Sequence, residues 1–195
     1  MTTPFRIRVL ATLLAAGALI AVVPDPAPEA APSPPALPDA ELVDQNGAPV
    51  RFVSDIAGGR IMALSFVYTE CRTACPVVSG LFSKLQDRLG DRLGREVRLV
   101  SLSIDPATDT PERLKAYAAR FHAAPGWLWL TGEKAQVDAL LKALGVYRAD
   151  YANHAPVILV GDPVRGEWTR FNGLPGPDAL AARIDELLEA RHEKS

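Results

Sequence analysis

Cysteine is scarce in this sequence, which has only Cys71 and Cys75 among 195 residues. Two cysteines exclude a scaffold of several disulfide bonds and a zinc site made of four cysteines from one chain. The chain also lacks a long run of Lys and Arg, and its 21 basic and 23 acidic residues give a formal charge of −2. This balance argues against binding of nucleic acid. The hydrophobic content of 48% is sufficient for the core of one globular domain.

A hydrophobic run long enough to cross a membrane is missing as well. The most apolar segment, residues 9–23, follows Arg6 and Arg8 and has fifteen residues. At ~1.5 Å per residue it covers roughly 22 Å of the ~30 Å hydrocarbon core of a bilayer. This length favours the core of a cleaved signal peptide, whereas the lack of a small-x-small cleavage site behind it favours a short, uncleaved anchor. Both alternatives place the rest of the chain in the periplasm, free or anchored at the inner membrane.

Proline is concentrated in one segment, residues 24–38, which contains seven prolines. Such a composition extends as polyproline II and does not pack into a core. We therefore predict three parts: a signal peptide or membrane anchor over residues 1–23, a linker over 24–38 and a folded domain over 39–195. The linker is a tether to the membrane or a leader without a mechanical role, and the sequence leaves both readings open.

The folded part alternates apolar runs with amphipathic stretches, and no internal repeat is visible. Strands are expected at residues 42–43, 50–52, 61–68, 97–104, 127–130, 156–160 and 167–171, and helices at 75–89, 109–122, 133–144 and 177–189. Asn46-Gly47 suits the turn of a hairpin between the first two strands. Helices between the central strands indicate a mainly parallel sheet covered on both faces. The closing hairpin and helix are typical of the thioredoxin fold, so we predict an α/β, thioredoxin-like domain.

The two cysteines stand four residues apart, between the first long strand and the first long helix. In a helical turn their Cβ atoms would lie ~5–6 Å apart on one face. A disulfide, with Cβ atoms ~3.8 Å apart, then closes only after local adjustment, and two thiolates also suit a soft cation such as Cu(I). Pro76 suits a first helical turn, so Cys75 is expected at the N-cap and Cys71 just before it, where the positive helix end lowers thiolate pKa values. The alternative is a passive disulfide or two buried thiols.

Four blocks of the sequence, in order, resemble the Sco/SenC family. They are Phe66-x-Tyr68-Thr69-x-Cys71-x-x-x-Cys75-Pro76, Ser101-x-Ser103-Ile104-Asp105-Pro106-x-x-Asp109-Thr110-Pro111, Leu130-Thr131-Gly132 and Asp150-Tyr151-x-x-His154, within residues 42–188. Members of this family are exported copper-binding proteins with a thioredoxin fold that assist assembly of cytochrome c oxidase. The resemblance implies that Cys71, Cys75 and His154 bind one copper ion, as Cu(I) or Cu(II), and that the partner is a copper-receiving oxidase subunit.

The residues themselves also favour His154 as a ligand. It precedes residues 156–160, a strand expected beside residues 61–68, so its ring should approach the thiols. An imidazole and two thiolates form a trigonal set that copper accepts. His122 and His192 are expected on the surface. Many family members carry an acid where this chain has Asn153, and many have a longer loop than residues 145–153 before the histidine.

Three further features allow more than one reading. Pro156 stands where thioredoxin-like redox proteins carry a cis-proline beside their dithiol. Asp109 is expected to cap a helix and Asp105 to belong to a turn with Pro106, in preference to a metal site. The tryptophans at 127, 129 and 168 are expected in the core or on a surface that faces a partner.

Two functions follow for what is expected to be a monomeric domain. The first is a copper metallochaperone for cytochrome c oxidase. The second is an exported thiol-disulfide oxidoreductase, in which Cys71 and Cys75 form a redox-active dithiol that acts on cysteines of the oxidase subunit or of another exported copper or thiol protein. A peroxidase is a weaker alternative, because no arginine for binding peroxide can be named. The first function requires His154 and the second does not.

Overall fold

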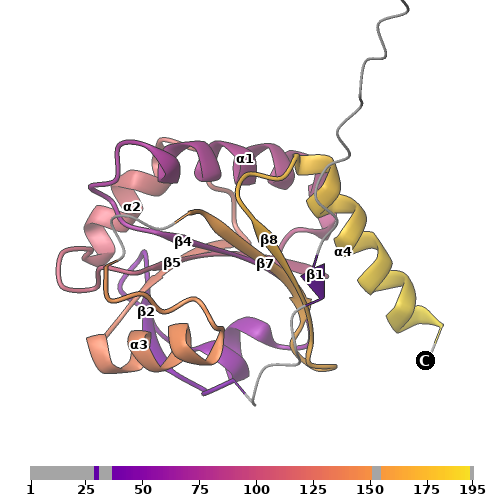
Figure 1. Cartoon of the computed structure of the whole chain (residues 1–195), viewed down its shortest axis with the longest axis horizontal. Coiled ribbons are helices and arrows are strands. Elements are labelled where there is room, and N and C mark those ends of the chain that lie inside the picture. The colour runs from indigo at the N-terminus through magenta and orange to yellow at the C-terminus, as the bar shows by residue number, and fades with distance from the viewer. Residues whose placement is uncertain (1–28, 31–36, 151–154, 194–195) are drawn as a thin grey trace, which may run out of the picture.

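The computed structural model describes residues 29–30, 37–150 and 155–193 (Figure 1). The apolar segment 9–23 and the predicted ligand His154 therefore lie outside the described residues. Within the described part of the chain, no helix is both long and apolar enough to cross a membrane. The folded body is one sheet with helices on both faces.

The sheet has the strand order β1-β8-β7-β4-β5-β6-β2-β3 among the described residues. In chain order the strands are β1 (Glu29–Ala30), β2 (Glu41–Asp44), β3 (Pro49–Arg51), β4 (Ile61–Val67), β5 (Val97–Ser103), β6 (Trp127–Thr131), β7 (Val157–Asp162) and β8 (Glu167–Asn172). The helices are α1 (Ala74–Leu89), α2 (Pro111–Ala119), α3 (Lys134–Ala143) and α4 (Pro177–His192), with a short π-helix η1 (Phe52–Ala57) and a 3-10 turn η2 (Gly90–Arg92). The predicted α/β class is confirmed, as is the order of its main elements.

The expectation of a mainly parallel sheet holds only at its centre. The pairs β4·β5 and β5·β6 are parallel, and the other pairs among the described strands are antiparallel. β7 opposes β4 because its beginning, not its end, lies where β4 ends: Ile158 pairs with Ser65. Alternation of strands and helices could not reveal this reversal, which puts the start of β7 beside the end of β4.

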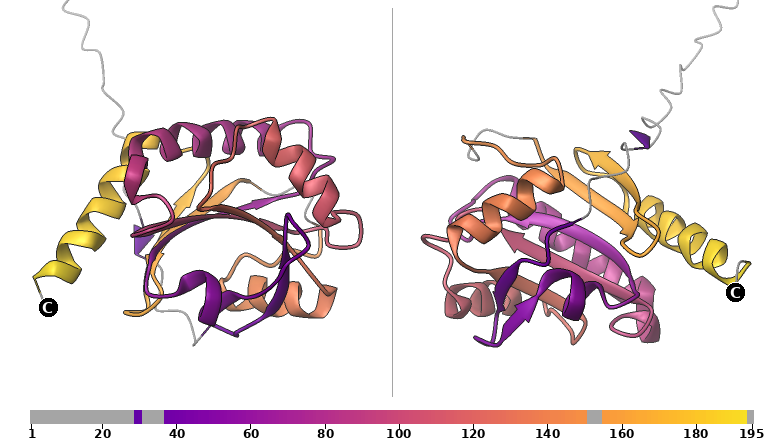
Figure 2. Two further views of the ribbon diagram at one scale, coloured as in Figure 1. Left: turned by 180° about the vertical axis from the view of Figure 1, so that it is seen from behind. Right: turned by 90° about the horizontal axis from the view of Figure 1, so that it is seen from below.

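The continuous apolar run of β4 is explained by burial of both faces. Ile61, Ala63 and Val67 join the core beneath α1, α2 and α4, whereas Met62 and Leu64 join the core beneath α3 and η1. Figure 2 shows these two layers of helices on opposite sides of the sheet. All three tryptophans belong to the two cores, with exposures of 0%, 0% and 6%, so they are core residues and not a surface for a partner.

Several boundaries differ from the sequence predictions. Glu29 and Ala30, within the segment predicted not to pack, form β1 against Arg170 and Thr169 at the edge of the sheet. Phe52 belongs to η1 and not to the hairpin strand, because its ring is fully buried beneath the sheet. α2 ends at Ala119, three residues before its predicted end, and α4 continues to His192. The hairpin itself is as predicted, with Gly47 at a φ of 82° in its turn.

Candidate dithiol and metal site

The two cysteines lie where β4 passes into α1. Thr73 occupies the N-cap position of α1, so Cys75 is the second residue of the helix and not its cap as predicted. Cys71 lies in the loop before it, and the backbone N–H of Cys75 donates to the Cys71 sulfur over 3.3 Å. Both are free thiols, and their residues are 6% and 5% exposed. The four-residue spacing therefore brings one sulfur against the first turn of the helix that carries the other.

The pKa of Cys71 is lowered from 9.0 to about 7. Burial alone would raise this pKa, but hydrogen bonds from the Cys75 thiol, from the backbone N–H groups of Cys75 and Thr73, and from the Tyr68 side chain outweigh it. Each of these bonds stabilises the thiolate relative to the thiol. Cys71 is therefore substantially ionised near neutral pH.

The pKa of Cys75 moves the other way, from 9.0 to about 12. Burial is the main cause, followed by the hydrogen bond that its thiol gives to Cys71 and by the negative charges of Cys71 and Asp109. The prediction that the helix end would lower both thiol pKa values is thus wrong for Cys75, because its sulfur is buried and its thiol is hydrogen-bonded to Cys71. The pKa values of the two thiols are therefore shifted in opposite directions, and Cys71 ionises first.

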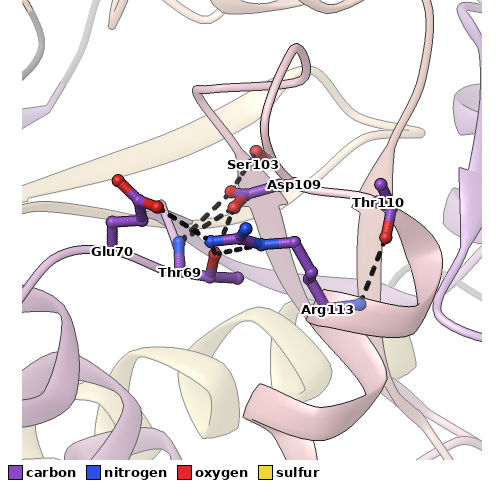
Figure 3. A network of polar contacts seen from close by, with 6 residues as sticks. All are labelled: Thr69, Glu70, Ser103, Asp109, Thr110 and Arg113. Atoms are coloured by element: carbon purple, nitrogen blue, oxygen red, sulfur yellow. Dashed lines mark hydrogen bonds and ion pairs between the residues drawn. The ribbon is translucent and has the colours of Figure 1, made fainter.

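A buried carboxylate, Asp109, ties the cysteine loop to the end of β5 (Figure 3). It accepts hydrogen bonds from the Thr69 backbone N–H at 3.0 Å, from the Thr69 hydroxyl at 2.6 Å and from the Ser103 hydroxyl at 2.6 Å. Asp109 is 1% exposed, so these donors compensate the cost of burying its charge. They fix the backbone two residues before Cys71.

The prediction that Asp109 caps α2 is therefore wrong. The neighbouring Thr110 is the N-cap, and its hydroxyl accepts from the backbone N–H of Arg113 at 3.3 Å. The sequence contains a signal for this difference. Asp109 and Thr110 are adjacent and both are able to cap the helix, so only one of them is needed as the N-cap. Asp105 lies in a turn as predicted, since its carbonyl accepts from the N–H groups of Thr108 and Asp109.

Arg113 forms a second link between α2 and the loop (Figure 3). Its guanidinium donates to the Thr69 hydroxyl at 3.2 Å and pairs with the Glu70 carboxylate at 3.1 Å. Both charged side chains are substantially exposed, so the ion pair itself contributes little stability. Its effect is on position: the loop is held from the interior by Asp109 and from the surface by Arg113.

The third predicted ligand, His154, is not among the described residues, so its place relative to the sulfurs stays a prediction. The strand that follows it is where the sequence put it, since β7 pairs with β4. Within residues 29–30, 37–150 and 155–193, no three His, Cys, Asp or Glu side chains form a group able to hold a metal. His122 and His192 are exposed as expected. No described peptide bond is cis, so Pro156 is not the cis-proline of a thioredoxin-like redox site.

The donor set fits a soft metal. Two sulfurs held within one loop and one helical turn are the ligands that Cu(I) prefers, and a third donor would complete a trigonal site. The same geometry suits thiol-disulfide exchange, which requires one ionised thiol and a second thiol close enough to resolve the mixed disulfide. Fold and site together define a thioredoxin-like α/β domain with a dithiol at its first strand-to-helix junction.

Comparison with known proteins identifies the family. Residues 30–189 match the model of the SCO1/SenC family, which covers more than half of the chain, so the chain belongs to this family. A relative from Stutzerimonas stutzeri is 37% identical over 111 residues, which are 57% of this chain and 52% of that protein. A SCO2-like protein from Rickettsia felis is 32% identical over 111 residues, with the same two coverages. The chain thus spans about half the length of the curated relatives it matches.

Solved structures agree on the fold. The structure of Bradyrhizobium japonicum ScoI with copper bound superposes with a TM-score of 0.64 at 25% identity, covering 77% of this chain and 98% of that one. Yeast Sco1 superposes with a TM-score of 0.64 at 20% identity, covering 82% of this chain and 99% of that one. The predicted family and its thioredoxin-like fold are both confirmed, and copper-bound members are among the structural neighbours.

Proposed function

We propose that this protein binds one copper ion through Cys71, Cys75 and His154 and delivers it to a subunit of cytochrome c oxidase. The observation that carries the proposal is the placement of Cys71 against the first turn of α1, with its sulfur 3.3 Å from the backbone nitrogen of Cys75. Two adjacent soft donors in a member of the SCO1/SenC family support copper as the cargo. Cys71 presents a thiolate near neutral pH, whereas Cys75 releases its proton when it becomes a ligand.

His154 is proposed as the third ligand because β7, which follows it, lies next to β4, which leads to the cysteines. The imidazole is more important for Cu(II) than for Cu(I), since two thiolates alone hold Cu(I) linearly. Asn153, which stands before it in place of an acid, adds no negative charge to the site. The resulting site carries two thiolate charges and one neutral imidazole.

Copper titration of the reduced protein tests the proposal, with His154→Ala and His122→Ala compared under the same conditions. The expected stoichiometry is one copper per chain, because only one pair of thiols exists. His154→Ala should lose the thiolate-to-Cu(II) charge-transfer absorption and retain part of its Cu(I) binding, whereas His122→Ala should behave as the unmodified protein. A stoichiometry near zero or near two, or an unchanged Cu(II) spectrum in His154→Ala, contradicts the proposed site.

A second function is supported by the unequal pKa values of the two thiols. A thiol with a pKa of about 7 beside a thiol with a pKa of about 12 is the pattern of an attacking and a resolving cysteine. As an exported thiol-disulfide oxidoreductase, the protein would reduce a disulfide between cysteines of its partner, with oxidation of Cys71 and Cys75 to a disulfide, before or instead of metal transfer. Oxidase assembly that survives His154→Ala and fails in Cys71→Ser would favour this function over copper delivery.

We further propose that the domain acts on the periplasmic side of the inner membrane. Arg6 and Arg8 before the apolar segment 9–23 support this orientation. A reporter enzyme fused to the C-terminus should be active in the periplasm, and activity only in the cytoplasm contradicts the assignment. The same fusion with the two arginines changed to glutamine tests whether they set the orientation.

A further inference from the structure

A hollow of about 620 Å³ opens beside Cys71. It is lined by Thr69, Glu70, Cys71, Arg72, Pro76, Arg113 and Arg120. Three of these side chains are arginines and one is a glutamate, so the lining carries an excess of positive charge next to a reactive sulfur. The metal and redox chemistry proposed above uses none of the three arginines.

The arginines differ in how they are held. Arg113 is bound to Glu70 and Thr69, so most of its charge is already matched. Arg120 lies over two aromatic rings, with its guanidinium carbon 5.0 Å from the ring centre of Tyr117 and 5.8 Å from that of Phe121. This stacking restrains the guanidinium and leaves its N–H groups available for hydrogen bonds.

Arg72 and Arg120 are both exposed, and neither has a carboxylate partner among the described residues. They reach the hollow from different elements. Arg72 follows Cys71 in the loop. Arg113 lies in the first turn of α2 and Arg120 is the residue at the C-cap of α2, seven residues or about two turns later, so both lie on the same side of that element. Lys115 lies about 200° around the same helix from Arg113 and does not line the hollow.

We propose that this arginine-lined hollow is the docking site for an acidic polypeptide segment of the protein that receives from, or exchanges with, Cys71. The proposal rests on the proposed function only in making Cys71 the reacting group. Charge complementarity selects an acidic occupant, because two guanidinium groups without carboxylate partners favour paired carboxylates in bidentate geometry. A polypeptide is favoured over a small anion because the hollow, at about 620 Å³, is large enough for several side chains, and Cys71 forms part of its lining.

Alkylation of the reduced, copper-free protein measures the charge at Cys71 directly. Iodoacetate is anionic and iodoacetamide is neutral, but in both reactions the thiolate forms an S–C bond and iodide leaves. When the iodoacetate rate is divided by the iodoacetamide rate, the fraction of thiolate cancels. The ratio therefore reports the local electrostatic potential at Cys71. We expect Arg72→Gln and Arg120→Gln each to lower this ratio about threefold, and Lys115→Gln, which removes the same charge elsewhere on α2, to leave it unchanged.

Docking itself is measured by fluorescence anisotropy with a labelled peptide that contains Asp and Glu and no cysteine. A second peptide with Asn and Gln at the same positions is the control. At low ionic strength the acidic peptide should bind tighter, and the double variant Arg72→Gln/Arg120→Gln should weaken it by about tenfold. Because the peptide has no thiol and no copper is present, failure of copper binding or of thiol exchange leaves this measurement intact.

Three results would overturn the proposal. The first is an alkylation ratio that the double variant does not change. The second is equal binding of the acidic and amide peptides. The third is displacement of the acidic peptide by glutarate at the same carboxylate concentration, which would make the hollow a site for small anions. Copper titration of the double variant should match that of the unmodified protein, since neither arginine is a proposed ligand.

Discussion

The carboxylate of Asp109 binds both the backbone N–H and the hydroxyl of Thr69, two residues before Cys71. A residue that follows β5 thereby positions the loop that follows β4. The two strands are parallel neighbours, so their ends meet at the same edge of the sheet. The geometry of the dithiol consequently depends on Asp109. Among the described residues, its side chain forms no hydrogen bond with either sulfur.

Replacing Asp109 with Asn should destabilise the protein and alter the cysteine loop. The amide keeps one acceptor but turns an N–H group toward donors, leaving buried hydrogen bonds unmade. We expect a loss of about 2 kcal/mol in the free energy of unfolding. Urea unfolding measures this loss. The rate of Cys71 alkylation at neutral pH should fall, because a displaced loop weakens the hydrogen bonds that lower the pKa of Cys71. Asp105→Asn, in the adjacent turn, is the matched control and should have little effect on either quantity.

The two thiols should affect stability in opposite directions as the pH rises. The folded pKa of Cys71, about 7, lies below its ordinary value of 9.0, so its contribution to stability is present above pH 9 and is lost as the pH falls through 7. The folded pKa of Cys75, about 12, lies above 9.0, so its contribution is present below pH 9 and is lost as the pH rises toward 12.

Urea unfolding of the reduced, copper-free protein over this pH range provides the test. The unmodified protein should gain stability relative to Cys71→Ser between pH 7 and 9, and should lose stability relative to Cys75→Ser above pH 9. The rate of alkylation by iodoacetamide, plotted against pH, should have a midpoint near pH 7 for Cys71 and not for Cys75. Parallel stability curves for all three proteins would contradict the assigned pKa directions.

The sequence was sufficient for the order of elements and for the thiol pair. Apolar runs and helical periodicity reflect local burial, and the runs at β4 and β5 are buried on both faces as predicted. The direction of β7 could not be predicted, because it depends on where the chain returns after α3 and not on the composition of the strand itself. Its antiparallel register with β4 is a tertiary property.

The site was less predictable than the fold, because it too depends on tertiary contacts. Spacing predicts that Cys71 and Cys75 lie close together, but the opposite shifts in their pKa values depend on which sulfur is buried deeper. Asp109 carries a helix-capping signal in the sequence, and the donors that redirect it, Thr69 and Ser103, come from two other segments. Local signals identify residues capable of a role, whereas tertiary contacts decide which role they take.

An ion pair joins the buried carboxylate of Asp162, at the end of β7, to Arg191 of α4. Asp162 is 0% exposed and accepts two hydrogen bonds of 2.6 Å from Arg191. Arg191→Met leaves this carboxylate buried without its cation, and we expect a loss of about 3 kcal/mol. Arg88→Met removes an exposed pair with Asp178 and should cost less than about 1 kcal/mol.

The pH dependence of this effect has a defined sign. Burial opposes ionisation of Asp162, but hydrogen bonds from Arg191 and from the backbone of Arg165 and Val164 hold its pKa below 3.8. Its contribution to stability is therefore present above pH 3.8 and is lost as the pH falls through the lower folded pKa. Thermal unfolding should separate Arg191→Met from the unmodified protein at neutral pH, and a difference that persists unchanged in strong acid would contradict this assignment.

Deleting residues 24–38 should impair delivery to a membrane-bound partner and spare the site. The deletion removes β1, which pairs with β8 at the edge of the sheet, and Leu37, which packs partly buried against the core beneath α3 and η1, so we expect a loss of stability of about 1 to 2 kcal/mol. Cys71 follows β4, which β8 and β7 separate from that edge, so the copper stoichiometry of the purified domain should not change. A deletion that abolishes copper binding would show that the segment has a structural role.

The length and stiffness of the segment can then be separated. A Gly/Ser chain is more flexible and on average shorter than the same number of residues extended as polyproline II, and it also lacks the pairing of Glu29 and Ala30 with β8. If the segment acts as a spacer, a Gly/Ser replacement of fifteen residues should restore oxidase assembly only in part, and a replacement several times longer should restore it further. Full assembly with the deletion alone contradicts the role as a spacer. Full assembly with the short replacement shows that the flexible span is already sufficient and that the prolines contribute no required stiffness.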